Sequence, residues 1–416
     1  MTGRAGFDDG VLSRSDKLTE LERRYGARNY APMPVVLERG EGVWLWDVTG
    51  RRYLDVMSAY SAVSLGHQHP RIVAVAKRQL NRLAVVSRAY YTDTLGPLMQ
   101  QVAGITGLDA MLPMNTGAEA VETAIKALRR HGYARGHIRD GQAEIIVANG
   151  NFHGRTTTIV GFSSEPAYRA GFGPFASGFV AVPFGDADAI ERAIGANTAG
   201  ILIEPIQGEA GIVVPPSGYL AKLREICTRR KIPLVFDEVQ SGLGRTGRMF
   251  CFEHEDARPD GLILGKALGG GIVPISAFVA TRELMDVFEP GSHGSTFGGN
   301  PFACAIADEA IRVLIEEELV ARSRVLGVEL LERLKAIRHP AIVDVRGKGL
   351  WVGVELDPAQ VSGGAVCRAM MRNGVLTKET HATVIRFAPA FVINSEELEF
   401  AVDVFRRSLE EETARG

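Results

Sequence analysis

The sequence predicts an α/β protein in which a large domain with a mainly parallel central sheet precedes a smaller α+β domain. Short apolar strand patterns alternate with amphipathic helix patterns between residues 110 and 285. Such alternation is typical of a parallel sheet with helices on both faces. From residue 302 a long helical stretch follows, and the later strands and helices come in a different order. A length of 416 residues also favours more than one domain.

The composition is that of a soluble globular enzyme. Hydrophobic residues make up 46% of the chain and charged residues 23%, both ordinary values. The formal net charge of −2 gives no reason to expect a nucleic acid or a membrane as a partner. No apolar run reaches membrane-spanning length.

The cysteine pattern and the first residues bear on location. Four scattered cysteines without a CxxC argue against a disulfide framework or a zinc site and fit a reducing compartment. The opening MTGRAGFDDG lacks the apolar core of a secretory signal, and its acids disfavour a transit peptide. We therefore expect a cytoplasmic location.

Residues 1–60 are predicted to form an N-terminal arm and a β-meander. Roughly the first fifteen residues are expected to be a mobile arm. A helix over 16–25 follows, and three short strands are predicted. They span 35–37, 43–46 and 52–55. This meander has too little core to fold alone, so we expect it to pack on a distant part of the chain.

Residues 61–317 are predicted to form the large domain. Its predicted strands are 110–113, 144–148, 179–182, 199–203, 232–236, 261–264 and 275–280. Its predicted helices are 70–83, 94–106, 116–130, 186–194 and 217–230. Ser217 is expected to cap the last of these helices. Ligands in such sheets lie at the carboxyl ends of the strands.

Residues 318–416 are predicted to form the small domain, with the boundary inside the helical stretch 302–339. Strands are predicted over 342–346 and 350–356, near 375 and over 384–387, with helices over 361–372 and from 395. Two histidines, His67 and His69, stand close together in an earlier loop, but no third ligand is near them. Hydrogen bonding is therefore favoured over metal binding.

Lys266 is the first candidate for chemistry. It comes just after the buried strand 261–264 and is followed by a glycine cluster, whose backbone can approach a ligand closely. A lysine removed from water loses its proton readily and becomes a nucleophile toward carbonyl groups. A lone loop lysine is more often simply solvated, so the assignment depends on its neighbours.

Asp237 supplies that neighbourhood. It ends the strand 232–236, and Lys266 lies 29 residues later (266 − 237), about one crossover unit. Both side chains are therefore expected at the same sheet edge. An acid and a lysine there suit pyridoxal phosphate: the lysine forms a Schiff base, and the acid keeps the pyridine nitrogen protonated as an electron sink. The alternative for Asp237 is a helix N-cap.

Further candidates stand beside the strands. Thr116 and Glu119 form a capping-box pattern, and the small Gly117 and Ala118 between them leave helix N–H groups open to a phosphate. The alternative is a plain cap. The loop with Ser295 and Thr296 is also rich in hydroxyl groups and glycine and suits a phosphate.

The segment after strand 144–148 carries Phe152 and Arg155. Phe152 suits stacking on a flat ring, and Arg155 suits bidentate binding of a substrate carboxylate. Taken alone, a core phenylalanine and a surface arginine are the simpler interpretation. Arg386 stands inside a strand pattern and needs a partner if buried, for which Glu209 is a candidate.

Together these segments resemble the class III, pyridoxal-phosphate-dependent aminotransferases of fold type I. Within that class they are most similar to ornithine aminotransferases. The motifs that carry the resemblance are NYAPMPVVLERGEGVWLWD, NTGAEAVE, NFHGRT, EPIQGEAG, FDEVQSGLGRTG, LGKALGGG, HGSTFGGNP and KETHATVIRFAP. The resemblance implies transfer of the δ-amino group of L-ornithine to 2-oxoglutarate, giving glutamate 5-semialdehyde and glutamate.

The resemblance also implies residue roles. Around the cofactor, Lys266 is the covalent attachment point, Asp237 holds the pyridinium, Phe152 stacks on the ring, and Gln240 hydrogen-bonds the phenolic oxygen. Gly117 and Ala118 bind the phosphate, joined by Thr296 from the other subunit of a homodimer.

For the substrates, the resemblance implies a pocket shaped by Tyr30, Tyr60 and Arg155. It also implies that Glu209 masks Arg386 while the amino donor is bound.

Some positions depart from the usual ornithine pattern and leave the amine donor open. Ser64-Leu65 stands where Asn-Gln is usual, Ala382 replaces an aspartate, and Ala390-Phe391 replaces Pro-Leu. The alternative donors are acetylornithine, lysine, 4-aminobutyrate and other diamines. An isomerase, a decarboxylase or a non-catalytic binding protein are further alternatives.

Overall fold

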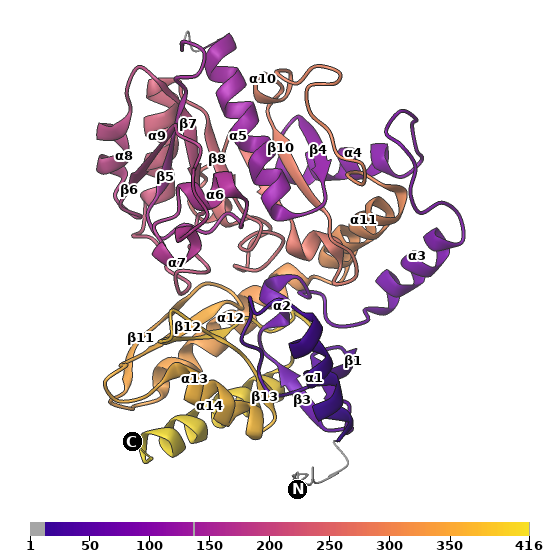
Figure 1. Cartoon of the computed structure of the whole chain (residues 1–416), viewed down its shortest axis with the longest axis vertical. Coiled ribbons are helices and arrows are strands. Elements are labelled where there is room, and N and C mark those ends of the chain that lie inside the picture. Colours follow the sequence, from indigo (N-terminus) through magenta and orange to yellow (C-terminus); the bar gives the residue numbers. More distant parts are fainter. Residues whose placement is uncertain (1–12, 136–137, 416) are drawn as a thin grey trace, which may run out of the picture.

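A seven-stranded sheet forms the centre of the larger part of the molecule, drawn at the top of Figure 1. The computed structural model describes residues 13–135 and 138–415, so most of the expected N-terminal arm lies outside the described residues. The strands, in spatial order, are β4 (Ala110–Met114), β10 (Ser276–Ala280), β9 (Gly261–Leu264), β8 (Leu234–Asp237), β7 (Thr198–Ile203), β5 (Glu144–Ala148) and β6 (Phe179–Val182). Only β10 runs against its neighbours, so the mainly parallel sheet predicted from the sequence is confirmed.

Both faces of this sheet are buried, because alternate residues of each strand point to opposite sides. Phe236 and Leu262 pack in one core, whereas their neighbours Val235 and Ile263 pack in the other. The first core is covered by α3 (Pro70–Leu80), α4 (Leu95–Thr106), α8 (Ala187–Ala193), α9 (Tyr219–Arg230) and α11 (Pro301–Glu316), and the second by α5 (Gly117–Ala134). Among the residues that the structure describes, no helix has the length and apolar character needed to span a bilayer.

The start of α9 differs from the prediction. Gly218, not Ser217, is the N-cap, and no side chain of the cap itself bonds to the helix. The Glu255 carboxylate instead accepts the Gly218 N–H at 2.9 Å and the Leu220 N–H at 2.8 Å. The cap prediction was wrong because a distant acid satisfies the free N–H groups that a local hydroxyl would otherwise serve.

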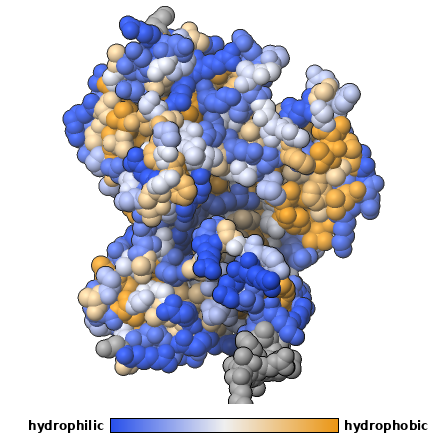
Figure 2. All heavy atoms as spheres, viewed as in Figure 1, coloured by the Kyte–Doolittle hydropathy of each residue, from blue (hydrophilic) through white to orange (hydrophobic). Residues whose placement is uncertain are grey.

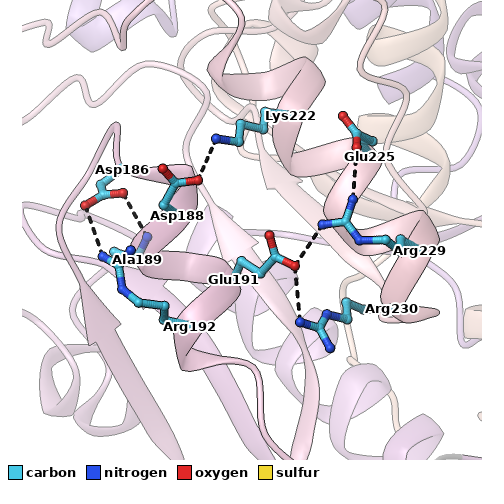
Figure 3. A network of polar contacts seen from close by, with 9 residues as sticks. All are labelled: Asp186, Asp188, Ala189, Glu191, Arg192, Lys222, Glu225, Arg229 and Arg230. Carbon is cyan, nitrogen blue, oxygen red and sulfur yellow. Dashed lines mark hydrogen bonds and ion pairs between the residues drawn. The ribbon is translucent and has the colours of Figure 1, made fainter.

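An exposed ion-pair network joins α9 to α8 (Figure 3). Glu191 Oε1 accepts from Arg229 Nη2 at 2.8 Å and from Arg230 Nη2 at 3.1 Å. Lys222 pairs with Asp188 on the same pair of helices. Because these side chains are largely in water, each pair contributes little to stability.

The first and the last described residues of the chain both belong to the smaller part (Figure 1). The predicted meander is present as β1 (Leu37–Glu41), β2 (Trp44–Asp47) and β3 (Arg52–Asp55), preceded by α1 (Arg14–Tyr25). The first strand was predicted too early, at 35–37. β3 pairs in parallel with β13 (Val375–Leu376), so the meander does pack on a distant segment, as expected.

The C-terminal sheet has the order β11 (Ile342–Gly347), β12 (Val352–Leu356), β15 (Val384–Phe387) and β14 (Glu379–Thr380). It packs with α12 (Leu319–Ala336), α13 (Gly363–Arg372) and α14 (Ser395–Thr413). Between α11 and α12, Glu318 has a φ of 53°, which breaks the predicted long helix into two. We keep residue 318 as the proposed start of the small domain and 61–317 as the proposed large domain.

The short helices were not expected from the sequence. They are α2 (Ser58–Ser61), α6 (Thr157–Gly161), α7 (Pro166–Arg169), α10 (Arg282–Met285), and the 3₁₀ turns η1 (Cys251–His254) and η2 (Lys266–Gly269). Each has too few residues to show a helical period.

The fully buried Arg245 joins three parts of the chain. Its guanidinium donates to the carbonyl oxygens of Leu350 and Pro389, each at 2.8 Å. It also donates to Ser64 Oγ at 2.7 Å, and its Cζ lies 4.6 Å from the centre of the Phe391 ring. Burial lowers the pKa of Arg245 to about 9. The two carbonyl groups and the aromatic ring partly offset this cost of burial by stabilising the charged guanidinium. Arg245 lies where the two parts of the molecule meet.

We predict that Arg245→Ala lowers the free energy of unfolding by about 3 kcal/mol or more, because it leaves two buried carbonyl groups and one hydroxyl without a donor. Urea or thermal unfolding measures the loss. As a control, Glu191→Ala in the exposed network should cost less than about 1 kcal/mol, and salt should reduce that cost further. Equal losses in the two variants would contradict this account of Arg245.

Candidate active site

A cavity of about 520 Å³ opens at the carboxyl ends of β8 and β9. Asp237 and Lys266 both line it. Because Asp237 is paired with Ile263 in the parallel ladder, the residue that ends β8 lies beside the end of β9. The crossover spacing thus brings the acid and the lysine to one edge of the sheet, as the sequence predicts.

The backbone conformation of Lys266, as well as its position after β9, sets it apart. Its φ is 43°, a conformation that side-chain-bearing residues rarely adopt, and such strain is often found at functional sites. Burial lowers the pKa of Lys266, although Glu209 and Asp237 oppose this effect by attracting its charged form. The amine is therefore more readily neutral than that of a solvated lysine, as a nucleophile requires.

Asp237 is held by His153, which sequence reasoning did not assign. His153 Nδ1 lies 2.7 Å from Asp237 Oδ2, with side chains 0% and 5% exposed. The Val239 N–H donates to Asp237 Oδ1 at 3.0 Å. Burial alone lowers the pKa of His153, but the hydrogen bond to Asp237 and the negative charges of Asp237 and Glu204 together outweigh it, so the net shift is upward. These contacts fix the orientation of the carboxylate.

Glu204 is a second acid at the cavity that sequence reasoning left without a role. It follows β7, and its Oε2 accepts the Phe152 N–H at 2.9 Å. Burial raises the pKa of Glu204 to about 8 despite the nearby His153. The side chain is therefore mostly protonated at neutral pH. The signal in the sequence was its place directly after a buried strand, like that of Asp237.

The start of α5 forms another wall of the cavity. Thr116 Oγ1 accepts the Glu119 N–H, and the Glu119 carboxylate accepts the Thr116 N–H, so the predicted capping box is present. Gly117 and Ala118 line the cavity. A Cβ on Gly117 would lie 3.1 Å from Val239 Cγ1, a tight contact that the glycine avoids. The first N–H groups of this 18-residue helix suit an anion.

Phe152 and Gln240 also line the cavity. Gln240 comes close to the loop after β7, because a Cβ on Gly208 would lie 2.3 Å from Gln240 Oε1. A glycine at position 208 is therefore required for this close approach.

Arg386 and Glu209 form a bidentate ion pair across the two parts of the molecule. Arg386 Nη1 lies 2.8 Å from Glu209 Oε1, and Arg386 Nη2 lies 2.7 Å from Glu209 Oε2. Burial alone raises the pKa of Glu209, but the hydrogen bonds from Arg386 and the positive charges of Arg386, Lys266 and Arg155 together outweigh it, so the pKa lies below its ordinary value. The fork of Arg386, whose side chain is 5% exposed, is thus used by Glu209.

Tyr60 lies beside this pair, with Arg386 Cζ 5.2 Å from its ring centre. It belongs to α2, where four consecutive residues, Ser58–Ser61, have positive φ values. Asp55 Oδ1 accepts the Met57 and Ser58 N–H groups, and these bonds help to hold the strained turn.

Seven predicted site residues do not line this cavity in their own chain: Tyr30, Tyr60, Arg155, Glu209, Ser295, Thr296 and Arg386. Tyr30 is 80% exposed. Ser295 Oγ accepts a hydrogen bond from Asn115 Nδ2 at 2.8 Å, and Thr296 is exposed; neither lines the cavity.

The two histidines considered for metal binding are hydrogen-bonded to acids. His67 Nε2 lies 2.9 Å from Asp55, and His69 Nε2 lies 3.2 Å from Glu317. These contacts agree with the interpretation that the sequence favoured.

The comparisons with known proteins agree with this geometry. The family model for class-III aminotransferases matches residues 25–409. Ornithine aminotransferase 2 of Staphylococcus saprophyticus is 51% identical over 399 residues, covering 96% of this chain and all of the relative. The crystal structure of the ornithine aminotransferase from Toxoplasma gondii ME49 has a TM-score of 0.94 and 40% identity, covering 96% of each chain. The acetylornithine aminotransferase of Elizabethkingia anophelis has a TM-score of 0.87 and 42% identity, covering 96% of this chain and 100% of that one.

The fold and the site define a pyridoxal-phosphate-dependent transferase with a fold type I architecture. Within that class, the chain belongs to the class-III aminotransferase family. The cavity residues fit the cofactor: Lys266 offers a nucleophilic amine, Asp237 a buried carboxylate, and α5 a set of free N–H groups beside a glycine. The chain is an aminotransferase that uses pyridoxal phosphate.

We predict a pH-dependent effect of Glu204→Gln on the melting temperature. The unfolded carboxyl has a pKa of 4.5 and the folded one about 8, so its favourable contribution to stability is complete below pH 4.5 and is lost as the pH rises toward 8. Glutamine stays neutral at every pH. The melting temperature of the variant should therefore rise relative to that of the parent protein as the pH increases from 4.5 to 8.

The matched control is Glu191→Gln, because Arg229 lowers the pKa of Glu191 and its titration falls below this range. A difference between Glu204→Gln and the parent that stays constant with pH would contradict the proposed titration.

Proposed function

We propose that the protein transfers the δ-amino group of L-ornithine to 2-oxoglutarate, giving glutamate 5-semialdehyde and glutamate. The observation that carries the proposal is the presence of two differently held arginines close to Glu209. Glu209 occupies the fork of Arg386, whereas Arg155 has no ion-pair partner among residues 13–135 and 138–415. Such a site suits two substrates whose carboxylates lie at different distances from the reacting carbon.

Ornithine fits the open arginine. Its δ-amine would have to reach the position of the cofactor's carbonyl carbon beside Lys266, while its α-carboxylate stays at the far end, where Arg155 would bind it. 2-Oxoglutarate must bring a carboxylate directly beside the reacting carbon, and Arg386 would bind that group after Glu209 moves away. The names of the relatives that act on ornithine support this assignment.

The proposed roles of the cofactor residues follow the cavity. Pyridoxal phosphate would be held by Lys266, Asp237 and Gln240 and stacked against Phe152, and it supplies an electrophilic carbonyl carbon and an electron-withdrawing ring. A further set of residues would hold the phosphate: Gly117 and Ala118, joined by Ser295 and Thr296 of a second subunit.

The residues of this chain would divide the remaining work. Lys266, with its lowered pKa, would take a proton from the δ-carbon of the donor and return it during the exchange. His153 would keep the Asp237 carboxylate oriented. Tyr60, whose pKa burial raises, would remain a neutral phenol beside Arg386. Tyr30 would complete the pocket for the donor.

The departures from the usual ornithine motifs do not reach the cavity. Ser64 donates to the Ser61 carbonyl and accepts from the buried arginine of the junction, and Phe391 packs on that same arginine. Leu65 and Ala390 are buried, and the Ala382 carbonyl accepts the N–H at the start of α13. None of the changed positions therefore lies in the wall of the cavity.

We also propose a homodimer with shared active sites. Figure 2 shows apolar surface on the right-hand side of the molecule, where Figure 1 places α3. The exposed large apolar residues of α3 and the segment after it are Leu80, Leu83, Val85, Tyr90 and Tyr91. Apolar surface of this kind favours contact with another protein, and Thr296 is exposed where a second copy is able to receive it. A cytoplasmic location, which the four free cysteines support, completes the proposal.

A donor panel tests the function. With 2-oxoglutarate as acceptor, ornithine should give the highest kcat/KM among ornithine, N-acetylornithine, lysine and 4-aminobutyrate, read as glutamate formed. Lys266→Ala should lose activity and the adduct that borohydride traps, whereas Lys231→Ala, an exposed lysine at the end of α9, should keep both. A preference for N-acetylornithine would instead assign the acetylornithine reaction.

A second prediction concerns Glu209. Glu209→Ala should increase α-transamination relative to δ-transamination by roughly tenfold, because the uncovered Arg386 attracts the α-carboxylate and reverses the bound ornithine. The ratio of cyclised glutamate semialdehyde to 2-oxo-5-aminopentanoate measures this effect. The companion variant Arg386→Ala should weaken the binding of 2-oxoglutarate without raising α-transamination. An unchanged product ratio in Glu209→Ala would contradict the proposal that Glu209 covers Arg386 while ornithine is bound.

A further inference from the structure

Arg155 is held by an aromatic ring. Its Cζ lies 3.7 Å from the centre of the Tyr168 ring, and 5.3 Å from that of Phe152. The Tyr168 and Phe152 rings meet edge to face, with centres 5.9 Å apart. A guanidinium this close to the centre of a ring is attracted by its π-face. Tyr168 is therefore the main contact that orients Arg155 among the described residues.

The kind of contact matters for the function of Arg155. A carboxylate partner would use the in-plane N–H groups of the guanidinium, as Glu209 does with Arg386. An aromatic partner lies against the face of the guanidinium and leaves the N–H donors at its edge free. Stacking therefore orients the charge without occupying the fork that a carboxylate would need.

The chain places Tyr168 through a short, well-fixed segment. α7 begins at Pro166, whose ring fixes φ, and the Glu165 side chain accepts the Ala167 N–H at its start. Burial is the main cause that raises the pKa of Tyr168, and its hydroxyl lies within electrostatic reach of Arg155, Glu209 and Arg386. The ring is thus a neutral, half-buried surface close to both arginines.

We propose that Tyr168 is a positioning residue that holds Arg155 ready for the far carboxylate of the amino donor, and so contributes to the preference for donors that carry one. The proposal rests on the proposed function, in which Arg155 binds that carboxylate. Tyr168 acts through Arg155 and does not itself take part in proton transfer. Its aromatic face, and not its hydroxyl group, is the part that matters.

The test compares two ligands in two variants of the holoenzyme. Tyr168→Leu removes the aromatic face and should raise the KM for ornithine about three- to tenfold, the range expected for a cation–π contact, with little change in kcat. The inhibition constant of 1,4-diaminobutane, which is ornithine without its carboxylate, should stay unchanged. Tyr168→Phe keeps the face and should restore the parent KM.

Three further variants separate this inference from the function on which it rests. Arg155→Ala should raise the KM for ornithine, and adding Tyr168→Leu to it should have no further effect. Arg169→Leu, an exposed neighbour on the same short helix, should leave the KM at the parent value.

An unchanged KM in Arg155→Ala would overturn the proposed role of Arg155. A raised KM in Arg155→Ala with a parent value in Tyr168→Leu would overturn the role of Tyr168 alone. Equal weakening of ornithine and 1,4-diaminobutane in Tyr168→Leu would show a general change of the pocket and would also overturn it.

Discussion

The parallel pairing of β8 with β9 is the constraint on which the site depends. Both strands are covered on both faces, so their side chains are committed to the two cores. Reactive polar side chains are therefore accessible only where the strands end. The parallel pairing places the ends of neighbouring strands at one edge of the sheet. Asp237 and Lys266 meet there because of backbone register. Glu204, at the end of the next strand β7, reaches the same cavity for the same reason.

The cofactor side and the substrate side of the site are built differently. The sheet and the start of α5 supply the cofactor side, and these elements share the buried cores that fix them. Across the substrate side, Arg386 comes from β15 of the smaller part, Glu209 from the loop after β7, and Tyr60 from the strained turn that follows β3. Their contacts depend on the joint that Arg245 holds with backbone carbonyl groups of the smaller part. The proposed substrate side therefore depends on how the two parts meet.

Local pattern was sufficient for most of the fold. The strands β5, β6 and β9 have the predicted bounds, because a continuous apolar run between turn residues marks clearly where a buried strand begins and ends. The errors have tertiary causes. The start of α9 depends on Glu255, which is distant in the sequence. Glu318 adopts a left-handed conformation that breaks a continuous helical pattern. The hydrophobic periodicity of the sequence indicates neither the cap that Glu255 provides nor the break at Glu318.

The sequence by itself determined the order of strands and helices, the meeting of Asp237 with Lys266, and the capping box at Thr116, because each follows from local pattern or from crossover length. Only the tertiary structure decided which side chains complete those groups. The bond from His153 to Asp237 and the stacking of Tyr168 on Arg155 join segments through the packing of loops. Loop conformation depends on contacts from the whole molecule, so spacing along the chain does not encode it.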